Sequence, residues 1–168
     1  MIIKSFKIFE SHDEIRSICD EYKIVSYVIN SDGSIDVDGN VCLDTRGLEK
    51  IPLRFRSVNG NFTCWENILE DLDGSPEFVG GYFSCEYNRL STLVGGPRSV
   101  GGFFQCSNNN ICSFKGAPET IGNGRFRCHG NPVDEVFSLF YAYGIDSSYN
   151  CVEWINEYDV IQDDKIIW

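Results

Sequence analysis

The apolar and polar positions of this chain repeat every 21 residues, as the spacing of Phe62, Phe83 and Phe104 shows. The three clearest copies read Phe62-x-Cys64-x-x-Asn67-x-Leu69-x-x-Leu72, Phe83-x-Cys85-x-x-Asn88-x-Leu90-x-x-Leu93 and Phe104-x-Cys106-x-x-Asn109-x-Ile111-x-x-Phe114. A weaker copy starts at Val41 and a last one at Phe126, which gives about five units. Because so short a unit cannot bury its own apolar face, the copies must stack into a solenoid with an extended, open surface.

The residues within each unit predict a short strand followed by turns. Phe and Cys stand two positions apart, which places both side chains on the same, buried face of a strand. The Asn that follows lies at the turn out of the strand, where its amide can satisfy backbone groups of its own and the adjacent coil. Sequences such as Gly95-Gly96-Pro97 then close each coil without room for a full helix. We therefore expect the strands of successive coils to form a parallel sheet with roughly 4.8 Å between neighbours.

The two ends predict caps, since the terminal coils of a solenoid need polar covers. At the front, Ser11-His12-Asp13-Glu14 ahead of Ile15 and Cys19 predicts an N-capped amphipathic helix, and residues 25–30 and 34–41 predict a hairpin. At the back, helical spacing predicts helices over 133–141 and 152–158, whose acidic residues either solvate this end or form a docking surface. The chain thus divides into an N-terminal cap at 1–36, a solenoid at 37–136 and a C-terminal cap at 137–168, within one cooperative domain.

The net charge of −11 limits the choice of partners. The chain has 14 Lys and Arg residues against 25 Asp and Glu residues, whereas binding to a nucleic-acid backbone needs clustered cations. We therefore expect no direct nucleic-acid binding. The sequence has no run of about 18 apolar residues, and its start at Met1-Ile2-Ile3-Lys4 is too short and too charged for a signal peptide. These features predict a cytoplasmic protein that does not enter membranes.

Eight cysteines raise the question of disulfides or metal binding. Four of them, Cys64, Cys85, Cys106 and Cys128, form a column one coil apart. No C-x-x-C pair is present for a structural zinc site, and side chains that all point inward do not face one another as a disulfide requires. We therefore expect buried thiols that fill a tight core, with neither a metal ion nor a cofactor.

The sequence also offers no catalytic constellation. The motifs G-x-S-x-G and H-E-x-x-H and the P-loop are absent, and neither His12 nor His129 has a visible acidic partner. The alternating polar residues from Asp32 to Asn40 favour hairpin and turn chemistry over a calcium loop, because the glycine at the sixth position of such a loop is missing. We predict that the protein is not an enzyme.

What remains is the outward side of the Phe-x-Cys strands. Its aromatic residues cost solubility if they are solvated, and Trp, Tyr and Arg dominate interface hot spots. The alternative is that the aromatic side chains pack against one another across strands or under a cap helix. The candidate partner-binding residues are Trp65, Tyr82, Ser84, Glu86, Phe103, Gln105, Arg125, Arg127 and His129, with Trp65, Tyr82 and Phe103 as anchors.

The repeat resembles the leucine-rich repeat, whose core reads L-x-x-L-x-L-x-x-N-x-L, with Phe and Cys in strand positions usually held by Leu. More narrowly, it is similar to the Gly-Gly-x-Phe-x-Cys-x-x-Asn-x-Leu-x-x-Leu-x-Gly-x-Pro repeats of leucine-rich-repeat proteins encoded by large tailed bacteriophages. The resemblance covers about residues 30 to 140. It implies a leucine-rich-repeat-like α/β solenoid with short parallel strands on one face, a helix-plus-hairpin N-cap and a helical C-cap.

The resemblance also suggests a role in host takeover. On this hypothesis the protein acts in the host cytoplasm, where it binds and modulates or inhibits a host defence or regulatory protein through its exposed strand face. Two other hypotheses remain open. The protein is a structural or assembly component of a virion, for which self-association is expected, or it is an acidic mimic of nucleic acid, which the net charge of −11 motivates.

Overall fold

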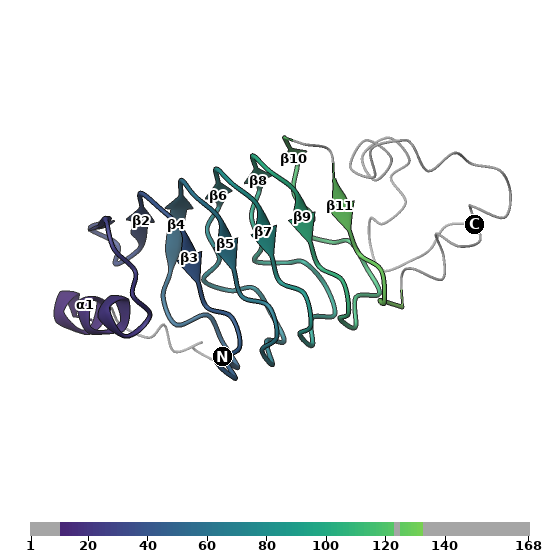
Figure 1. Ribbon diagram of the computed structural model, residues 1–168, viewed down its shortest axis with the longest axis horizontal. Coiled ribbons are helices and arrows are strands. Elements are labelled where there is room, and N and C mark those ends of the chain that lie inside the picture. The colour runs from purple at the N-terminus through teal and green to yellow at the C-terminus, as the bar shows by residue number, and fades with distance from the viewer. Residues whose placement is uncertain (1–10, 123–124, 133–168) are drawn as a thin grey trace, which may run out of the picture.

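The computed structural model describes residues 11–122 and 125–132, which form a β-solenoid of about four turns (Figure 1). Each coil contributes one short strand to each of two sheets, and the coils lie side by side along the long axis of the molecule. One sheet contains, in spatial order, β1 (Tyr27–Ile29), β2 (Ile35–Val37), β4 (Phe55–Val58), β6 (Phe78–Val79), β8 (Ser99–Val100) and β10 (Thr120–Ile121). The other contains β11 (Phe126–Arg127), β9 (Phe104–Gln105), β7 (Phe83–Ser84), β5 (Phe62–Thr63) and β3 (Val41–Cys42).

The N-terminal end contains both elements that the sequence predicts. Helix α1 (His12–Glu21) begins with a capping box, in which Ser11 accepts from the backbone N–H of Glu14 and the Glu14 carboxylate accepts from the backbone N–H of Ser11. Its residues Ile15 and Cys19 are buried against the first coil. Strands β1 and β2 pair in antiparallel fashion across a tight turn, and β2 then pairs in parallel with β4. The hairpin is thus confirmed, and it leads directly into the solenoid.

The coils themselves contain no helix in the described part of the chain, where α1 is the one helix. The fold is therefore a β-solenoid. The more specific expectation of leucine-rich-repeat-like α/β coils is not confirmed. The arc after each strand closes through Gly-x-Pro turns in which Gly74, Gly95 and Gly116 have positive φ, and so short an arc has no room for a helix. The helices expected over 133–141 and 152–158 lie outside the described residues, as does the C-terminal cap.

The structure has two parallel sheets where the sequence predicted one. The additional strands lie just before the Gly-Gly pairs, where a single apolar residue such as Val79 or Val100 enters the core. At the corner between the sheets, successive coils approach so closely that a Cβ on Gly101 would lie 2.2 Å from the carbonyl oxygen of Gly80. A strand with one apolar residue gives no alternating pattern, which is why sequence periodicity missed it.

The core is built from the same side chains in every coil. Phe62, Phe83, Phe104 and Phe126 form a continuous stack with ring centroids 5.5, 5.1 and 5.2 Å apart. The column of cysteines is confirmed as free thiols, with the first three fully buried and Cys128 half-buried. Burial raises the pKa of the Cys85 and Cys106 thiols, so these thiols stay protonated and serve as packing groups.

The repeated asparagines tie each coil to the preceding one. The Oδ1 atom of Asn88 accepts from the backbone N–H of Leu69 at 3.0 Å, and its Nδ2 donates to the carbonyl oxygens of Cys64 at 2.9 Å and Cys85 at 3.2 Å. The same arrangement recurs at Asn67, Asn109 and Asn131. All four side chains are buried, so the predicted asparagine ladder is confirmed and supplies partners for backbone groups that turns leave without one.

Candidate protein-binding face

The strands of the sheet β3-β5-β7-β9-β11 follow one another along the solenoid (Figure 1). Their parallel register arranges the outward side chains in three columns that run in the same direction. We call this surface the strand face. Its first column contains Asn61, Tyr82, Phe103 and Arg125, its middle column Cys42, Thr63, Ser84, Gln105 and Arg127, and its third column Asp44, Trp65, Glu86, Ser107 and His129. Parallel pairing in register, with one extra residue before β11, brings residues about 21 positions apart to neighbouring places.

The candidate residues differ widely in exposure. Trp65, Arg125, Arg127 and His129 are exposed, whereas Tyr82, Glu86, Phe103 and Gln105 are half-buried. Ser84 is only 3% exposed, so its side chain adds little accessible surface to the strand face. Its short side chain lies below the level of its longer neighbours, and its hydroxyl points to the Glu86 carboxylate at 3.4 Å.

Tyr82 and Phe103 do not stand free as separate anchors. Their rings stack with centroids 4.7 Å apart and an interplanar angle of 9°. Each ring face that meets the other is closed to a partner, and the edges remain toward solvent. For these two residues the alternative of cross-strand packing applies, which leaves Trp65 as the one exposed aromatic side chain among the candidates.

Asp44 belongs to the strand face, although the sequence analysis did not single it out. Its Oδ1 accepts from the backbone N–H of Trp65 at 3.1 Å, and its Oδ2 accepts from the Thr63 hydroxyl at 2.8 Å and the Cys42 thiol at 3.1 Å. These three donors fix the carboxylate beside the indole. The signal that could have found it is its offset, because Asp44 follows Val41 by three positions, as Trp65 follows Phe62.

The charges of the strand face are unpaired within the described residues. Neither Arg125 nor Arg127 has a described acidic group within 4.0 Å, and neither Asp44 nor Glu86 has a described cation within that distance. Arg127 is the last residue of the edge strand β11. A surface with charges of both signs that are not paired with one another can attract complementary charges.

A serine–histidine pair on this face resembles a nucleophile with its base. The Ser107 hydroxyl lies 3.0 Å from Nδ1 of His129, a contact that the sequence analysis did not foresee. However, Ser107 is 0% exposed, so its hydroxyl is out of reach of a substrate, and the contact orients the imidazole. Within the part of the chain that the structure describes, no group of three or more His, Cys, Asp and Glu side chains could hold a metal ion.

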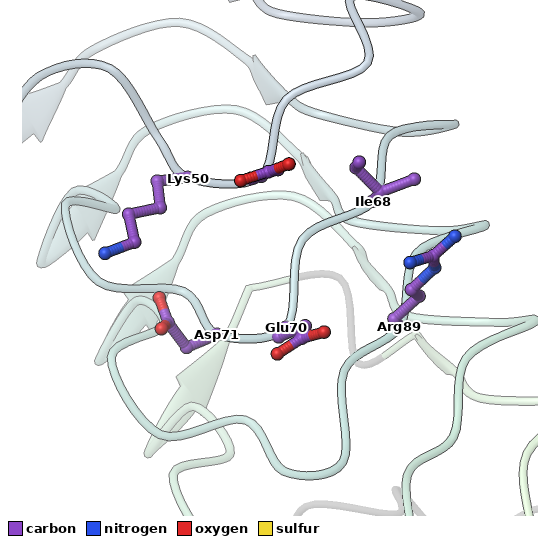
Figure 2. A pocket seen from close by; sticks show the side chains of 6 residues that line it. Lys50, Ile68, Glu70, Asp71 and Arg89 are labelled. Carbon is purple, nitrogen blue, oxygen red and sulfur yellow. The ribbon is translucent and has the colours of Figure 1, made fainter.

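A shallow pocket lies on the return arcs of the coils (Figure 2). Charged side chains of both signs surround it, with Lys50 and Asp71 on one side and Arg89 beside Ile68 on the other. Glu49 and Glu70 complete its lining. No thiol, hydroxyl or imidazole lines it.

Comparisons with known proteins found no significant match, whether to a family model, a curated protein or a solved structure. In the described part of the chain, no helix has the length and apolar character needed to cross a lipid bilayer.

Proposed function

We propose that this protein is a non-enzymatic binding module whose strand face holds another protein. The observation that supports this proposal is the exposed Trp65 indole on the same face as the exposed Arg125 and Arg127, which have no acidic group within 4.0 Å in the part of the chain that the structure describes. Trp and Arg are the residue types that contribute most to binding at protein interfaces. An exposed indole on a solvated strand stabilises the fold little, so a role in recognition accounts for its position better than a role in packing.

The scaffold suits such a role because it is rigid. The phenylalanine stack and the asparagine ladder fix each coil to its neighbours, so the strand face needs little ordering when a partner binds. A preorganised surface loses less conformational entropy on association, which favours affinity. Binding would block or distort the partner without any chemical step.

For the biological context we propose a phage protein that acts on a host defence or regulatory protein in the host cytoplasm. Support comes from the resemblance of the repeats to those of leucine-rich-repeat proteins of large tailed bacteriophages. The acidic-mimic hypothesis keeps the support of the net charge of −11. Against it stand the exposed cations of β11, since a mimic of a phosphate backbone presents acidic groups to its target.

The test is capture of a partner from bacterial lysate, followed by identification by mass spectrometry. The variant Trp65→Ser/Arg127→Ser removes two exposed side chains of the strand face. Its matched control, Lys50→Ser/Asp71→Ser, removes two exposed side chains of the return arcs. We expect the wild type and the control to retain the same protein and the strand-face variant to lose it, while all three unfold cooperatively.

Other outcomes distinguish the alternatives. If the strand-face variant retains the partner, the strand face is not the binding site. Capture that disappears at high salt but survives loss of Trp65 would favour the acidic mimic, because screening weakens charge attraction and leaves apolar contacts intact. Self-association in sedimentation experiments, with no captured partner, would favour a virion assembly component.

A further inference from the structure

The strand face carries opposite charges at its two ends. The acidic end consists of Asp44 and Glu86 on either side of Trp65 in the third column. The basic end consists of Arg125 and Arg127, just before and at the end of β11. Between the two ends lies the β9 coil with Phe103 and the neutral Gln105, and the Phe103 ring stacks on Tyr82 of the β7 coil.

The acidic end has the composition of a site for a cationic side chain. A guanidinium or ammonium group is attracted to the face of an indole, and more strongly when carboxylates stand nearby. Asp44 is held in place by three donors, and Glu86 is half-buried with the Ser84 hydroxyl near it. Neither carboxylate has a cation within 4.0 Å among the described residues. The attraction is therefore available to a partner.

The arginines beside the strands of the other sheet are paired with acids. On that sheet Arg56 pairs with Asp36, Arg54 with Asp32 at 3.1 Å, and Arg98 with Glu119 at 2.7 Å. Sequence spacing places an acid one coil from each of these arginines. On the strand face the β9 coil lies between Glu86 and the two arginines of the β11 coil, and no described acid and cation of this face lie within 4.0 Å of each other.

The dimensions of the strand face favour an extended segment as its occupant. Four coil steps and the length of a short strand give an area of roughly 19 Å by 13 Å, from ordinary sheet spacings. That is about 250 Å², well below the roughly 800 Å² per partner of a stable interface between globular surfaces. A second copy of this chain, pressed face to face, would bury too little surface to form a stable dimer.

We propose that the strand face binds an extended segment of its partner that carries a cationic and an acidic residue about four positions apart. The cationic side chain, arginine or lysine, lies on Trp65 between Asp44 and Glu86, and the acidic side chain pairs with Arg125 and Arg127. The spacing follows from the three coil steps between β5 and β11, roughly 14 Å, against about 3.3 Å per extended residue. This inference rests on the proposed function, because it specifies the partner of the same face.

The experiment measures the binding of labelled synthetic hexapeptides to the full chain by fluorescence anisotropy at low ionic strength. One peptide carries arginine first and two glutamates last, with three Gly and Ser residues between them, and a second has the reverse order. Two controls of the same length carry only the arginine or only the glutamates. We expect one of the two bipolar peptides to bind at least about ten-fold more tightly than either control, as two charge-assisted contacts in place of one imply.

Variants assign the two ends. Trp65→Leu and Glu86→Gln should each weaken binding of the bipolar peptide about ten-fold and leave binding of the glutamate-only peptide unchanged. Arg127→Gln should weaken the binding of both peptides. Glu70→Gln on the return arc is the matched control for a lost carboxylate and should change neither.

Three results would overturn the inference. Equal binding of the bipolar and glutamate-only peptides would mean that the basic end acts alone. Absence of binding by every peptide would remove the extended segment as occupant, even if lysate capture still supports a protein partner on this face. Dimer formation that Trp65→Leu abolishes would show that a second copy is the occupant.

Discussion

The two sides of the sheet β3-β5-β7-β9-β11 differ in how they use the repeat. On the inward side every complete coil places a phenylalanine, then a cysteine, and the side chains are almost interchangeable from coil to coil. On the outward side the third column changes at each coil, from Asp44 to Trp65, Glu86, Ser107 and His129. The comparison teaches that the period of the sequence specifies the fold, while departures from the period are confined to the outward side, which we propose as the binding surface.

The two sheets differ in a similar way in how they handle charge. The sheet that starts at β1 neutralises its arginines with carboxylates one coil away. The strand face keeps its exposed cations and its acids apart. Paired charges on one sheet support the scaffold modestly, whereas the charges of the strand face form no ion pair among the described residues.

The largest expected effect is on the inward side. Phe83→Ala removes a fully buried ring that stacks on two others, and should lower the free energy of unfolding by about 3–5 kcal/mol. The outward counterpart Phe103→Ala removes a half-buried ring with one stacking partner and should cost only about 1 kcal/mol. Urea unfolding followed by circular dichroism gives both values. Equal losses of unfolding free energy in the two variants would contradict the proposed difference between the inward and outward sides.

A smaller loss is expected for the asparagine ladder. Asn88→Ala leaves the Leu69 N–H and the Cys64 and Cys85 carbonyls without their side-chain partner in a buried turn. We expect a loss of about 2–3 kcal/mol, because buried polar groups without partners keep their desolvation cost. Asn110→Ala, at an exposed position, is the control and should be nearly neutral. A neutral Asn88→Ala would mean that the ladder does not hold the coils together.

Loss of an ion pair on the other sheet should have the smallest effect on the free energy of unfolding, and the size of this effect should depend on pH. Hydrogen bonds from Arg56, then Ser57 and Asn30, lower the pKa of the Asp36 carboxyl from 3.8 to about 2. A carboxyl whose pKa is lowered on folding stabilises the protein above its unfolded pKa, and this contribution is lost as pH falls from about 4 to about 2. Asp36→Asn should therefore cost about 1 kcal/mol at neutral pH, after allowance for solvent screening, and flatten the acid limb of the stability profile.

Urea midpoints measured across that pH range check this expectation. The control is Glu49→Gln, which removes an exposed carboxylate on the return arc and should leave the acid limb unchanged. If Asp36→Asn and wild type lose stability in parallel as the pH falls, Asp36 does not contribute in the way that its contacts indicate.

Much of the fold could be predicted from the sequence, because its main determinant is periodic. The spacing of Phe62, Phe83 and Phe104 was enough to predict the stacked coils, and the following Asn and Cys positions predicted the ladder and the buried thiols. The second sheet was missed, since strands of two residues with one buried side chain, such as Val100, leave no alternation to detect.

The strand face was predicted less well. Alternation placed Trp65 and Arg127 correctly on the outward side, but it treats every outward residue as exposed. Burial of Ser84 depends on the length of its neighbours in adjacent coils, and the stacking of Tyr82 on Phe103 depends on register. These are properties of packing between coils, which the order of residues along one strand does not contain.

The most direct test of the difference between the two sides is a variant that retains every inward-facing residue of the repeat and replaces the outward-facing residues that vary from coil to coil. This variant carries threonine, a residue with high strand propensity, in place of Trp65, Glu86, Arg125 and Arg127. Cooperative urea unfolding and lysate capture are then measured on the same preparation. We predict a midpoint close to that of the wild type and complete loss of the captured partner. A variant that retains the partner, or no longer unfolds cooperatively, would contradict the account.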